Sequence, residues 1–487
     1  MLARHRLAFA LLVPCFSGAV LRLPAQQTAR IRAVENGLIP SVRIKGRPLP
    51  PMTLAARMKK YHVPAVSIAV IDDYAMEWTK AYGLAEPATR TPADTGTLFP
   101  VGSLSQPIAA TVALSLAQAK KLDLDRDVNR SLKSWKIPKS DLTKNRPVTV
   151  RRLLAHSAGL TTTTAPGYAP EAPLPTLAQI LAGVPPTRTP PIAVQQPPGQ
   201  DFRISASDYV VLQQVLLDAT RRPFGELATE TVLRPLGMTR SVFQQPLAPP
   251  FAAWAAAGHD STGKPLAGKW RVYPEEAAAG FWTTAPDLAR FAVDLELASA
   301  GKPARAFKPE TAKQMLGPEH VGWPGLGVMI EGRDDFIRFR VAGTTQGFES
   351  EMVAYARRGQ GAVVLTNAAG GGALIDEILN GIARVYGWPD YVPAEKVIAK
   401  VDWRVYDRFV GTYSADGRTV SVTRRANRLF IGAAGKERTE LLPESVNDFF
   451  TPDSDAQYSF VFDQNGKVQA FTVRRRDEYA RWNRSPG

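Results

Sequence analysis

Ser103 and Gln106 are the residues of this chain whose types and spacing point most directly to chemistry. They lie in the stretch FPVGSLSQPIAA, residues 99–110, where a helical pattern begins. Side chains three positions apart on a helix share one face, so the group at 106 stands where a base would take the proton of a serine nucleophile. A lysine amine would serve there, but a glutamine amide is no base. The stretch therefore predicts a nucleophile candidate, Ser103, with no base beside it.

Helices and strands are predicted on both sides of this stretch. From Pro107 onward apolar residues recur at helical spacing, and the proline is tolerated because it falls in the first turn. Residues 63–86 predict a hairpin that turns at Asp72-Asp73, and residues 341–367 predict two more strands joined at 357–359. Helices between blocks of strands indicate an α+β fold with a mainly antiparallel sheet.

The middle of the chain is predicted to be helical and rich in loops. Residues 148–160, VTVRRLLAHSAGL, predict a short helix that ends at Gly159, and residues 205–235 return to a helical pattern. Many of the chain's prolines gather in residues 164–199, around a short helical piece at 177–181. This segment is interpreted as an ordered loop excursion or a flexible flap rather than a core element.

The last part of the chain differs in character from what precedes it. Residues 402–487 show short alternating runs, with strong hairpin turns at Asp416-Gly417 and Asn465-Gly466. They predict a small antiparallel sandwich or barrel that forms a separate domain.

Length and composition are those of a globular protein with more than one domain. The chain has 487 residues, of which 45% are hydrophobic and 22% charged, which predicts two or three domains. A basic start followed by a short apolar run predicts a signal peptide over residues 1–25, ahead of a polar lead-in over 26–50. The single cysteine, Cys15, would leave with the signal, so neither a disulfide nor a thiol nucleophile is expected.

Charge and metal-ligand patterns exclude two other classes of function. The net charge is +15, but the basic residues are scattered and no nucleic-acid motif is present, so a solvated basic surface is expected. Asp123, Asp125 and Asp127 alternate as in a calcium loop, but the glycine and closing glutamate of such a loop are missing. The sequence predicts no metal, no cofactor and no nucleic-acid partner.

Several segments, taken in order, resemble the serine β-lactamase and penicillin-binding-protein family, on the branch of class C β-lactamases, D-aminopeptidases and related esterases. The segments are VPAVSIAVI with YGLAE, LFPVGSLSQ, LDLDRDV, VTVRRLLAHSAGL, PPGQDFRISASDYVVLQQVL, VLRPLGMTRSVF, AAAGFWTTAPDLARF, GTTQGFES and VVLTN. The resemblance implies a β-lactamase/transpeptidase-like domain over residues 51–395, with an antiparallel sheet flanked by helices and a helical subdomain. Residues 402–487 resemble the lipocalin-like all-β domain often appended to this family.

The family's chemistry needs three motifs, and this chain departs from each. They are S-x-x-K at a helix start, Y-x-N on a loop, and K-T-G or H-x-G on a strand. By the resemblance they fall on residues 103–106, 204–206 and 341–343. The lysine is replaced by Gln106, the tyrosine and asparagine by Ile204 and Ala206, and the basic strand residue by Val341, while Gly343 is kept.

The resemblance also implies an oxyanion hole that these changes leave intact. In the family it is formed by two backbone N–H groups, which here would belong to Ser103 and to Thr344, the residue after Gly343. Side-chain replacements do not remove backbone donors.

Other side chains are candidates to replace the missing base. His156 is interpreted as fixing a loop by a hydrogen bond, because the family carries a histidine there without using it as the base. Tyr168 and Tyr273 would lie near the cleft and are expected to pack. Asp208 is expected to face away from the site. Ser105 and Ser205 are inherited family positions; surface, packing or variable positions are assigned to His62, His259, His320 and Glu349.

Two hypotheses of function remain. The first is a secreted or periplasmic family member that is catalytically impaired and binds a small-molecule, peptide or cell-wall-type ligand in its cleft, or a partner protein. The alternative is an active acyl-serine hydrolase, such as an esterase, D-amino-acid peptidase or β-lactamase-like enzyme, that uses Ser103 with an unidentified base. No stable membrane span is expected after signal removal, and the oligomeric state is left open.

Overall fold

The computed structural model describes residues 23–49, 52–317, 324–332, 334–415, 418–433, 438–452, 454–475 and 478–485. Most of the predicted signal peptide, including Cys15, lies outside the described residues, as do His320 and the Asp416-Gly417 turn. Within the described part of the chain, no helix is both long and apolar enough to cross a membrane.

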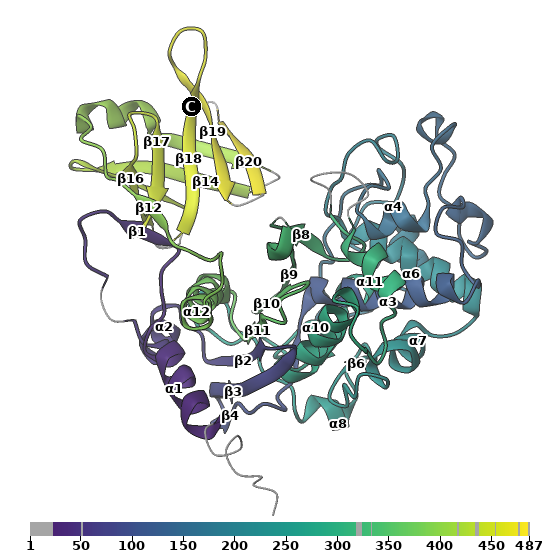
Figure 1. Ribbon diagram of the computed structural model, residues 1–487. Helices are drawn as coiled ribbons and strands as arrows, with labels where there is room; N and C mark the ends of the chain where they lie inside the picture. Colours follow the sequence, from purple (N-terminus) through teal and green to yellow (C-terminus); the bar gives the residue numbers. More distant parts are fainter. Residues whose placement is uncertain are drawn as a thin grey trace, which may run out of the picture.

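A seven-stranded sheet forms the centre of the larger part of the molecule (Figure 1). Its spatial order is β4-β3-β2-β11-β10-β9-β8, and every neighbouring pair is antiparallel, as predicted. The strands are β2 (Ala65–Asp72), β3 (Ala75–Glu86), β4 (Thr91–Pro92), β8 (Met329–Glu331), β9 (Arg338–Thr345), β10 (Phe348–Tyr355) and β11 (Gly361–Thr366). The β2–β3 hairpin is confirmed, but its turn is Asp73-Tyr74, one residue later than the predicted Asp72-Asp73; both turn residues take positive φ.

Residues 341–367 form parts of three strands rather than the two that were predicted. The missed break is Gln346-Gly347, between β9 and β10. Gly347 has φ +85°, which a glycine adopts without strain. The near-continuous run of strand-forming residues on both sides hid this two-residue turn.

Different helices cover the two faces of the sheet. On one face Ala69 and Ile71 of β2 pack in a cluster with α10 (Ala285–Ser299); on the other Val66 and Ile68 pack with α12 (Gly371–Tyr386). Because β2 is buried on both faces, its sequence is a continuous apolar run rather than an alternation. Each fully buried aliphatic side chain of this kind contributes about 1.5–3 kcal/mol relative to an exposed one.

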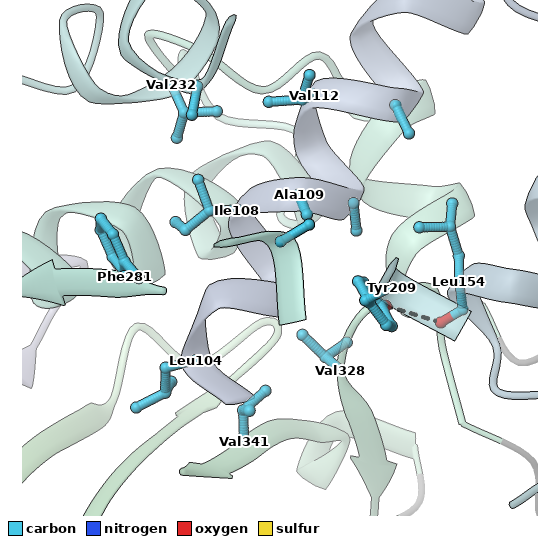
Figure 2. Close-up of a cluster of buried hydrophobic side chains, with 14 of the residues drawn as sticks. Leu104, Ile108, Ala109, Val112, Leu154, Tyr209, Val232, Phe281, Val328 and Val341 are labelled. Atoms are coloured by element: carbon cyan, nitrogen blue, oxygen red, sulfur yellow. Dashed lines mark hydrogen bonds between the residues drawn. The ribbon is translucent and has the colours of Figure 1, made fainter. Parts of the chain in front are cut away.

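The helical part packs around α3 (Ser105–Gln118), whose residues 105–114 are all buried. Leu104, Ile108 and Val112 project into a cluster formed by neighbouring helices and strands (Figure 2). Around α3 lie α4 (Val150–Leu154), α6 (Ala206–Thr220), α7 (Phe224–Ala228) with a π-helical turn (Thr229–Leu233), α9 (Glu276–Ala279) and α11 (Pro309–Leu316). The first ten residues of α3 are buried on every side, so this part of the helix lies in the core.

The helix predicted to end at Gly159 is shorter than expected. It is α4, and it ends at Leu154. His156 takes φ 53°, a left-handed conformation that a continuing helix does not allow, and the Ser157 N–H closes the turn on the Arg152 carbonyl.

The proline-rich segment, residues 164–199, is tied to the body of the protein by backbone hydrogen bonds. Tyr168 and Val272 exchange two of them, at 2.8 Å each, and Thr161 bonds to Ala193. The helical piece expected at 177–181 is α5 (Leu177–Ala182), which begins with a capping box at Thr176. These contacts favour the ordered loop excursion over the flexible flap.

Residues 411–484 form a closed antiparallel barrel of eight strands, as predicted for the C-terminal part. The strands are β13 (Gly411–Ala415), β14 (Arg418–Arg425), β15 (Arg428–Gly432), β16 (Thr439–Pro443), β17 (Asp448–Thr451), β18 (Ser454–Phe462), β19 (Val468–Arg475) and β20 (Glu478–Arg484). Closure removes the open edges of the sheet, and an interior cluster with Phe409, Phe449, Phe460 and Phe471 fills it.

The predicted lead-in contains regular structure that the sequence analysis did not predict. Helix α1 (Leu23–Glu35) lies beside the sheet, and β1 (Val42–Ile44) pairs in parallel with β12 (Ala394–Lys396). Val42 packs against Leu442 and Phe450 of the barrel. The remaining elements are α2 (Leu54–Lys60), β5 (Phe99–Pro100), β6 (Val242–Phe243), α8 (Pro249–Ala252), β7 (Phe281–Thr283) and the 3-10 helices η1 (Gly102–Leu104), η2 (Val128–Arg130), η3 (Asp141–Thr143), η5 (Asp334–Phe336) and η6 (Trp403–Phe409).

Candidate functional site

Ser103 lies in the 3-10 turn η1, which leads directly into α3. The side chain is partly exposed, and among the described residues its hydroxyl has no hydrogen-bond partner. Gly102 has φ +54°, and a Cβ there would lie 2.7 Å from the carbonyl oxygen of Thr344. The glycine therefore allows the turn that carries Ser103 to lie directly against β9.

Hydrogen bonds join the end of β9 to the segment before Ser103. The Ser350 hydroxyl lies 3.1 Å from the Gly343 carbonyl oxygen and 3.3 Å from that of Val101, so it can donate to either. Thr345 donates from its hydroxyl to the Pro100 carbonyl at 3.4 Å. The structure thus brings Thr344 and Gly343 beside the Ser103 turn, where the sequence analysis expected them.

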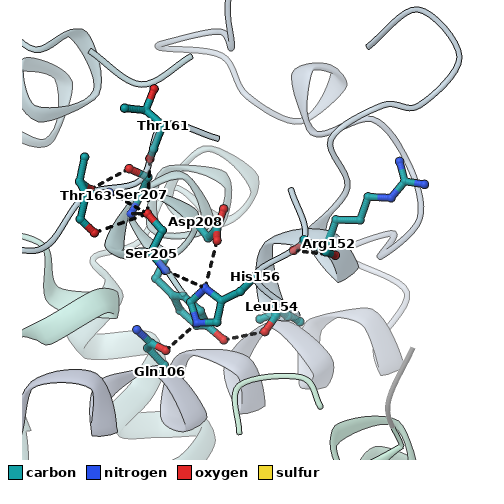
Figure 3. A network of polar contacts seen from close by, with 11 residues as sticks. Gln106, Arg152, Leu154, His156, Thr161, Thr163, Ser205, Ser207 and Asp208 are labelled. Atoms are coloured by element: carbon teal, nitrogen blue, oxygen red, sulfur yellow. Dashed lines mark hydrogen bonds and ion pairs between the residues drawn. The ribbon is translucent and has the colours of Figure 1, made fainter. Parts of the chain in front are cut away.

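Gln106 is buried at the position where the family motif has lysine, and its amide contacts a histidine. Its Oε1 lies 3.1 Å from Nε2 of His156, and Nδ1 of His156 lies 3.0 Å from Oδ2 of Asp208 (Figure 3). Gln106, His156 and Asp208 are each less than a tenth exposed. The amide is thereby engaged in a buried polar chain from α3 to α6.

The prediction that Asp208 faces away from the site is wrong. Asp208 lies in the first turn of α6, is fully buried, and its carboxyl is directed at His156. Burial raises the pKa of Asp208, and the hydrogen bond to His156 opposes that rise. No sequence signal could have found this contact, because ten consecutive residues of α6, from 207 to 216, are buried and no face of the helix stands out.

The second motif position is structural rather than catalytic in this chain. Ser205 caps the N-terminus of α6: its hydroxyl oxygen accepts from the backbone N–H groups of Ser207 and Thr163 at 3.2 and 3.0 Å. Ala206 is the first residue of α6. Ile204, at the tyrosine position, is 59% exposed and presents an apolar surface.

Val341 stands where the third motif has a basic residue, and its side chain is part of the hydrophobic core. It is 7% exposed and lies beside Leu104 and Val328 (Figure 2). A charged side chain at 341 would therefore have to enter an apolar cluster.

The other residues weighed as bases are engaged elsewhere. The Tyr273 hydroxyl accepts from the Gln346 N–H at 3.0 Å, and burial raises the pKa of Tyr273. The Tyr168 hydroxyl lies 3.3 Å from that of Thr187. Nδ1 of His259 lies 3.0 Å from the Asn367 carbonyl oxygen. His62 is exposed on a surface turn, Ser105 bonds to the Gly102 carbonyl, and Glu349 pairs across the strands with Thr344.

Two acids near the site, Glu275, which is buried, and Glu276, which is partly buried, are not predicted from the sequence. Glu275 and Glu276 begin the α9 segment, which packs against α3, α6 and η1. Burial raises the pKa of each to about 7. Two adjacent glutamates before a short alanine run are typical of an exposed helix start. The sequence therefore does not predict their burial, which depends on tertiary packing.

The alternating aspartates do not gather into a metal site. Asp125 forms a bidentate pair with Arg151, at 2.7 and 2.9 Å. Among the described residues, no group of three or more histidine, cysteine, aspartate or glutamate side chains is arranged to hold a metal ion.

Comparison with known proteins places this fold and site in a family. The beta-lactamase family model matches residues 53–383, and the chain belongs to that family. The predicted resemblance and the predicted fold are thereby confirmed.

Its relatives are distant. The chain is similar to Protein flp of Staphylococcus aureus (strain N315), at 22% identity over 327 residues that cover 64% of this chain and 61% of flp, less than two thirds of that protein's length. It is 24% identical over 438 residues to Penicillin-binding protein 4* of Bacillus subtilis (strain 168), covering 80% of this chain and 90% of that protein. The octameric penicillin-binding protein homologue from Pyrococcus abyssi shares the fold, with TM-score 0.59, 20% identity, and coverage of 88% of this chain and 98% of that one.

Proposed function

We propose that this protein is a secreted member of the beta-lactamase family that binds a ligand at Ser103 without hydrolysing it at a useful rate. The observation that carries the proposal is the state of Gln106. It occupies the position of the expected base, its amide is bonded to His156, and no titratable side chain in the described part of the chain hydrogen-bonds to Ser103.

The known rate contributions of a general base and of an oxyanion hole support catalytic impairment rather than slow but useful turnover. A general base contributes about 100- to 10,000-fold to a rate. When the base of a serine hydrolase triad is removed, only about 10³–10⁴-fold over water remains, from the oxyanion hole and binding. Both proton-transferring positions are changed here, to Gln106 and Ile204, so turnover should be close to that residual.

What the site retains is suited to binding. The backbone N–H groups of Ser103 and Thr344 would be donors to a carbonyl oxygen, and exposed Ile204 would add apolar contact. The expected ligand is an acyl compound, a peptide or a cell-wall fragment that carries such a carbonyl.

Intact-mass analysis tests the absence of turnover. The protein is incubated with a fluorophosphonate and, separately, with a penicillin, beside a Ser103→Ala control. No added mass after hours, in protein shown to be folded, is the expected result. A Ser103-dependent mass increase within minutes would instead establish the alternative, an active acyl-serine hydrolase.

Calorimetry tests the binding role with penicillin and an acetylated D-alanyl-D-alanine peptide as probes. Ile204→Asp places a charge at the exposed apolar position of the site and should weaken binding at least about tenfold, which corresponds to about 1.4 kcal/mol. Val446→Asp changes a similarly exposed apolar residue, 49% accessible, on the barrel and should leave binding unchanged. Failure of both probes to bind the wild-type protein would contradict this ligand class.

Secretion rests on the residue pattern of the first 25 positions. The mass of the protein recovered outside the cytoplasm should correspond to cleavage after Ala19 or Ala25. Recovery of the full-length chain in the cytoplasm would contradict this part of the proposal.

A further inference from the structure

A buried acid–base pair lies immediately behind Gln106 and has no role in the proposed binding function. Asp208 and His156 are joined at 3.0 Å between Oδ2 and Nδ1. The ring of His156 packs on Tyr209, with centroids 5.2 Å apart, and its Nε2 faces the Gln106 amide. The side chains of Asp208 and His156 are only 3% and 7% exposed, so both are shielded from solvent. Buried polar groups are costly unless they are bonded, so such a pair needs an explanation.

The contacts of the imidazole indicate which nitrogen carries the proton. The structure turns the amide oxygen of Gln106 toward the ring, and in this orientation Nε2 is the donor of the bond. On the other side of the ring, the Ser205 N–H points at Nδ1 from 3.4 Å, which favours Nδ1 as an acceptor. A protonated Asp208 would donate to Nδ1 and complete the set; burial raises the pKa of that carboxyl, which favours the protonated form, while the hydrogen bond to His156 opposes the rise.

With this arrangement of protons, Nε2 of His156 cannot act as a base. A nitrogen that already carries a proton cannot accept one, and here the proton of Nε2 is held by a carbonyl oxygen. Ser103 lies in η1 and Gln106 is the second residue of α3, which continues η1, so the two side chains are expected to share one face with Cβ atoms about 5–6 Å apart. The Gln106 amide, which contacts Nε2 of His156 directly, is thus expected to separate the histidine from the serine.

We propose that Gln106 holds a latent acid–base pair, His156 and Asp208, out of reaction with Ser103, and that a smaller residue at 106 with no acceptor releases it. The inference rests on the proposed function in one respect, that Ser103 is the reactive position of the site. It adds that the means of activating Ser103 is present in the fold and is blocked by one side chain.

The released pair would activate Ser103 toward a fluorophosphonate. In Gln106→Ala the carbonyl oxygen that fixed the Nε2 proton is gone; this proton leaves to water, and the Asp208 proton moves to Nδ1. One water fills the space left by the amide, between Nε2 and the Ser103 hydroxyl. Ser103 Oγ attacks phosphorus while its proton passes through the water to Nε2; the P–O bond forms, the P–F bond breaks and fluoride leaves. The imidazolium beside the Asp208 carboxylate then returns its proton to water.

Labelling rates in matched variants test the proposal. Gln106→Ala should label about 100-fold faster than the wild type, the lower end of what a general base contributes. Gln106→Met also removes the acceptor but keeps the space filled, and it should label at the wild-type rate. Adding Ser103→Ala or His156→Asn to Gln106→Ala should abolish the gain; the asparagine keeps a donor for Asp208. A folded Gln106→Ala protein that labels no faster than the wild type would overturn the proposal.

A second measurement has its deciding result in the wild-type protein, so that result does not depend on the folding of a variant. Nitrogen-15 chemical shifts of His156 in the wild-type protein should show the proton on Nε2, and in Gln106→Met the neutral ring should carry it on Nδ1. A wild-type ring protonated only on Nδ1 overturns the inference and leaves the proposed binding function standing. Rapid wild-type labelling at Ser103 overturns the proposed function instead, and the ratio of the Gln106→Ala rate to the wild-type rate still decides the inference.

Discussion

Gly343 and Val101 lie so close that a Cβ at 343 would stand 1.9 Å from the Val101 carbonyl oxygen. No side chain is compatible with that distance, so Gly343→Ala must push β9 away from the turn that carries Ser103. We expect a loss of about 1–3 kcal/mol in the free energy of unfolding, as for other overpacked sites, and weaker binding of carbonyl ligands. Chemical denaturation and calorimetry measure the two effects.

The control for Gly343→Ala is the preceding residue. Ala342 is exposed on the same strand, so Ala342→Ser should change neither stability nor binding. A Gly343→Ala protein as stable as the wild type would mean that the strand and the turn are free to separate.

Restoring the family motifs should require several changes at once. Gln106→Lys alone places an ammonium beside His156 in a buried site, and we expect no gain in acylation because position 204 still lacks a phenol. The combination Gln106→Lys, Ile204→Tyr, Ala206→Asn and Val341→His should acylate with penicillin at least about 100-fold faster than any single variant, since residues that act as a unit are not additive. Intact mass over time measures the rates.

The four-fold variant carries its own control, the same protein with Ser103→Ala. Val341→His is the change most apt to destabilise it, because Val341 is packed beside Leu104 and Val328. Equal labelling of the single Gln106→Lys variant and the combination would show that the lysine position alone determines activity.

The elements that local patterns specify are those that the sequence predicts. The β2–β3 hairpin follows from two strand-forming runs and a turn, and α3 follows from helical spacing after Pro107. The break at Gln346-Gly347 and the helix α1 were missed. The first is a short turn inside a run of strand residues, and the second has no apolar stripe and is held by contacts such as Arg30 with Asp72.

The candidate site likewise contains residues that the sequence predicts and one contact that it does not. Spacing alone marks Ser103 and Gln106, and the resemblance predicts that Gly343 and Thr344 lie beside them. The close approach of Gly102 to Thr344 in the structure agrees with this prediction. The His156–Asp208 pair joins residues 52 positions apart. Nothing local in either segment records such a contact, because it depends on how α4 and α6 are brought together.

The stability of the protein should fall between about pH 4.5 and pH 7 because of Glu275. Both of its carboxylate oxygens are buried and have no hydrogen-bond partner among the described residues, and burial raises its pKa from 4.5 to about 7. A raised carboxyl pKa means that the folded state holds the proton more tightly, so its contribution is complete below pH 4.5 and is lost as the pH rises through 7. The loss is up to about 3 kcal/mol.

Glu275→Gln keeps a neutral side chain at every pH and should flatten this part of the profile. The slope should fall by about half rather than vanish, because burial raises the pKa of Glu276 to about 7 as well. Urea denaturation across the pH range measures it, with the exposed Glu310→Gln as a control that leaves the profile unchanged. A Glu275→Gln profile parallel to the wild type would mean that Glu275 is ionised in the folded protein.

Val42 should hold the barrel against the N-terminal segment. It is 3% exposed and packs on Leu442 and Phe450, while its strand pairs with β12 just ahead of the barrel. Val42→Asp buries a charge in this contact, at a cost of about 3 kcal/mol or more from lost apolar burial and desolvation. We expect β1 to detach from β12 and the barrel to lose its fixed position.

Limited trypsin digestion detects the detachment at Lys396, whose ammonium contacts both carboxylate oxygens of Glu444 at 2.9 Å in the intact contact. Cleavage after Lys396 should become at least about tenfold faster in Val42→Asp, since a loss of 1.4 kcal/mol in local closure is enough for that factor. Arg43 is exposed on the same strand, and Arg43→Ala should leave the rate unchanged. If Val42→Asp is cleaved no faster than Arg43→Ala, the barrel is held by its connecting segment and not by β1.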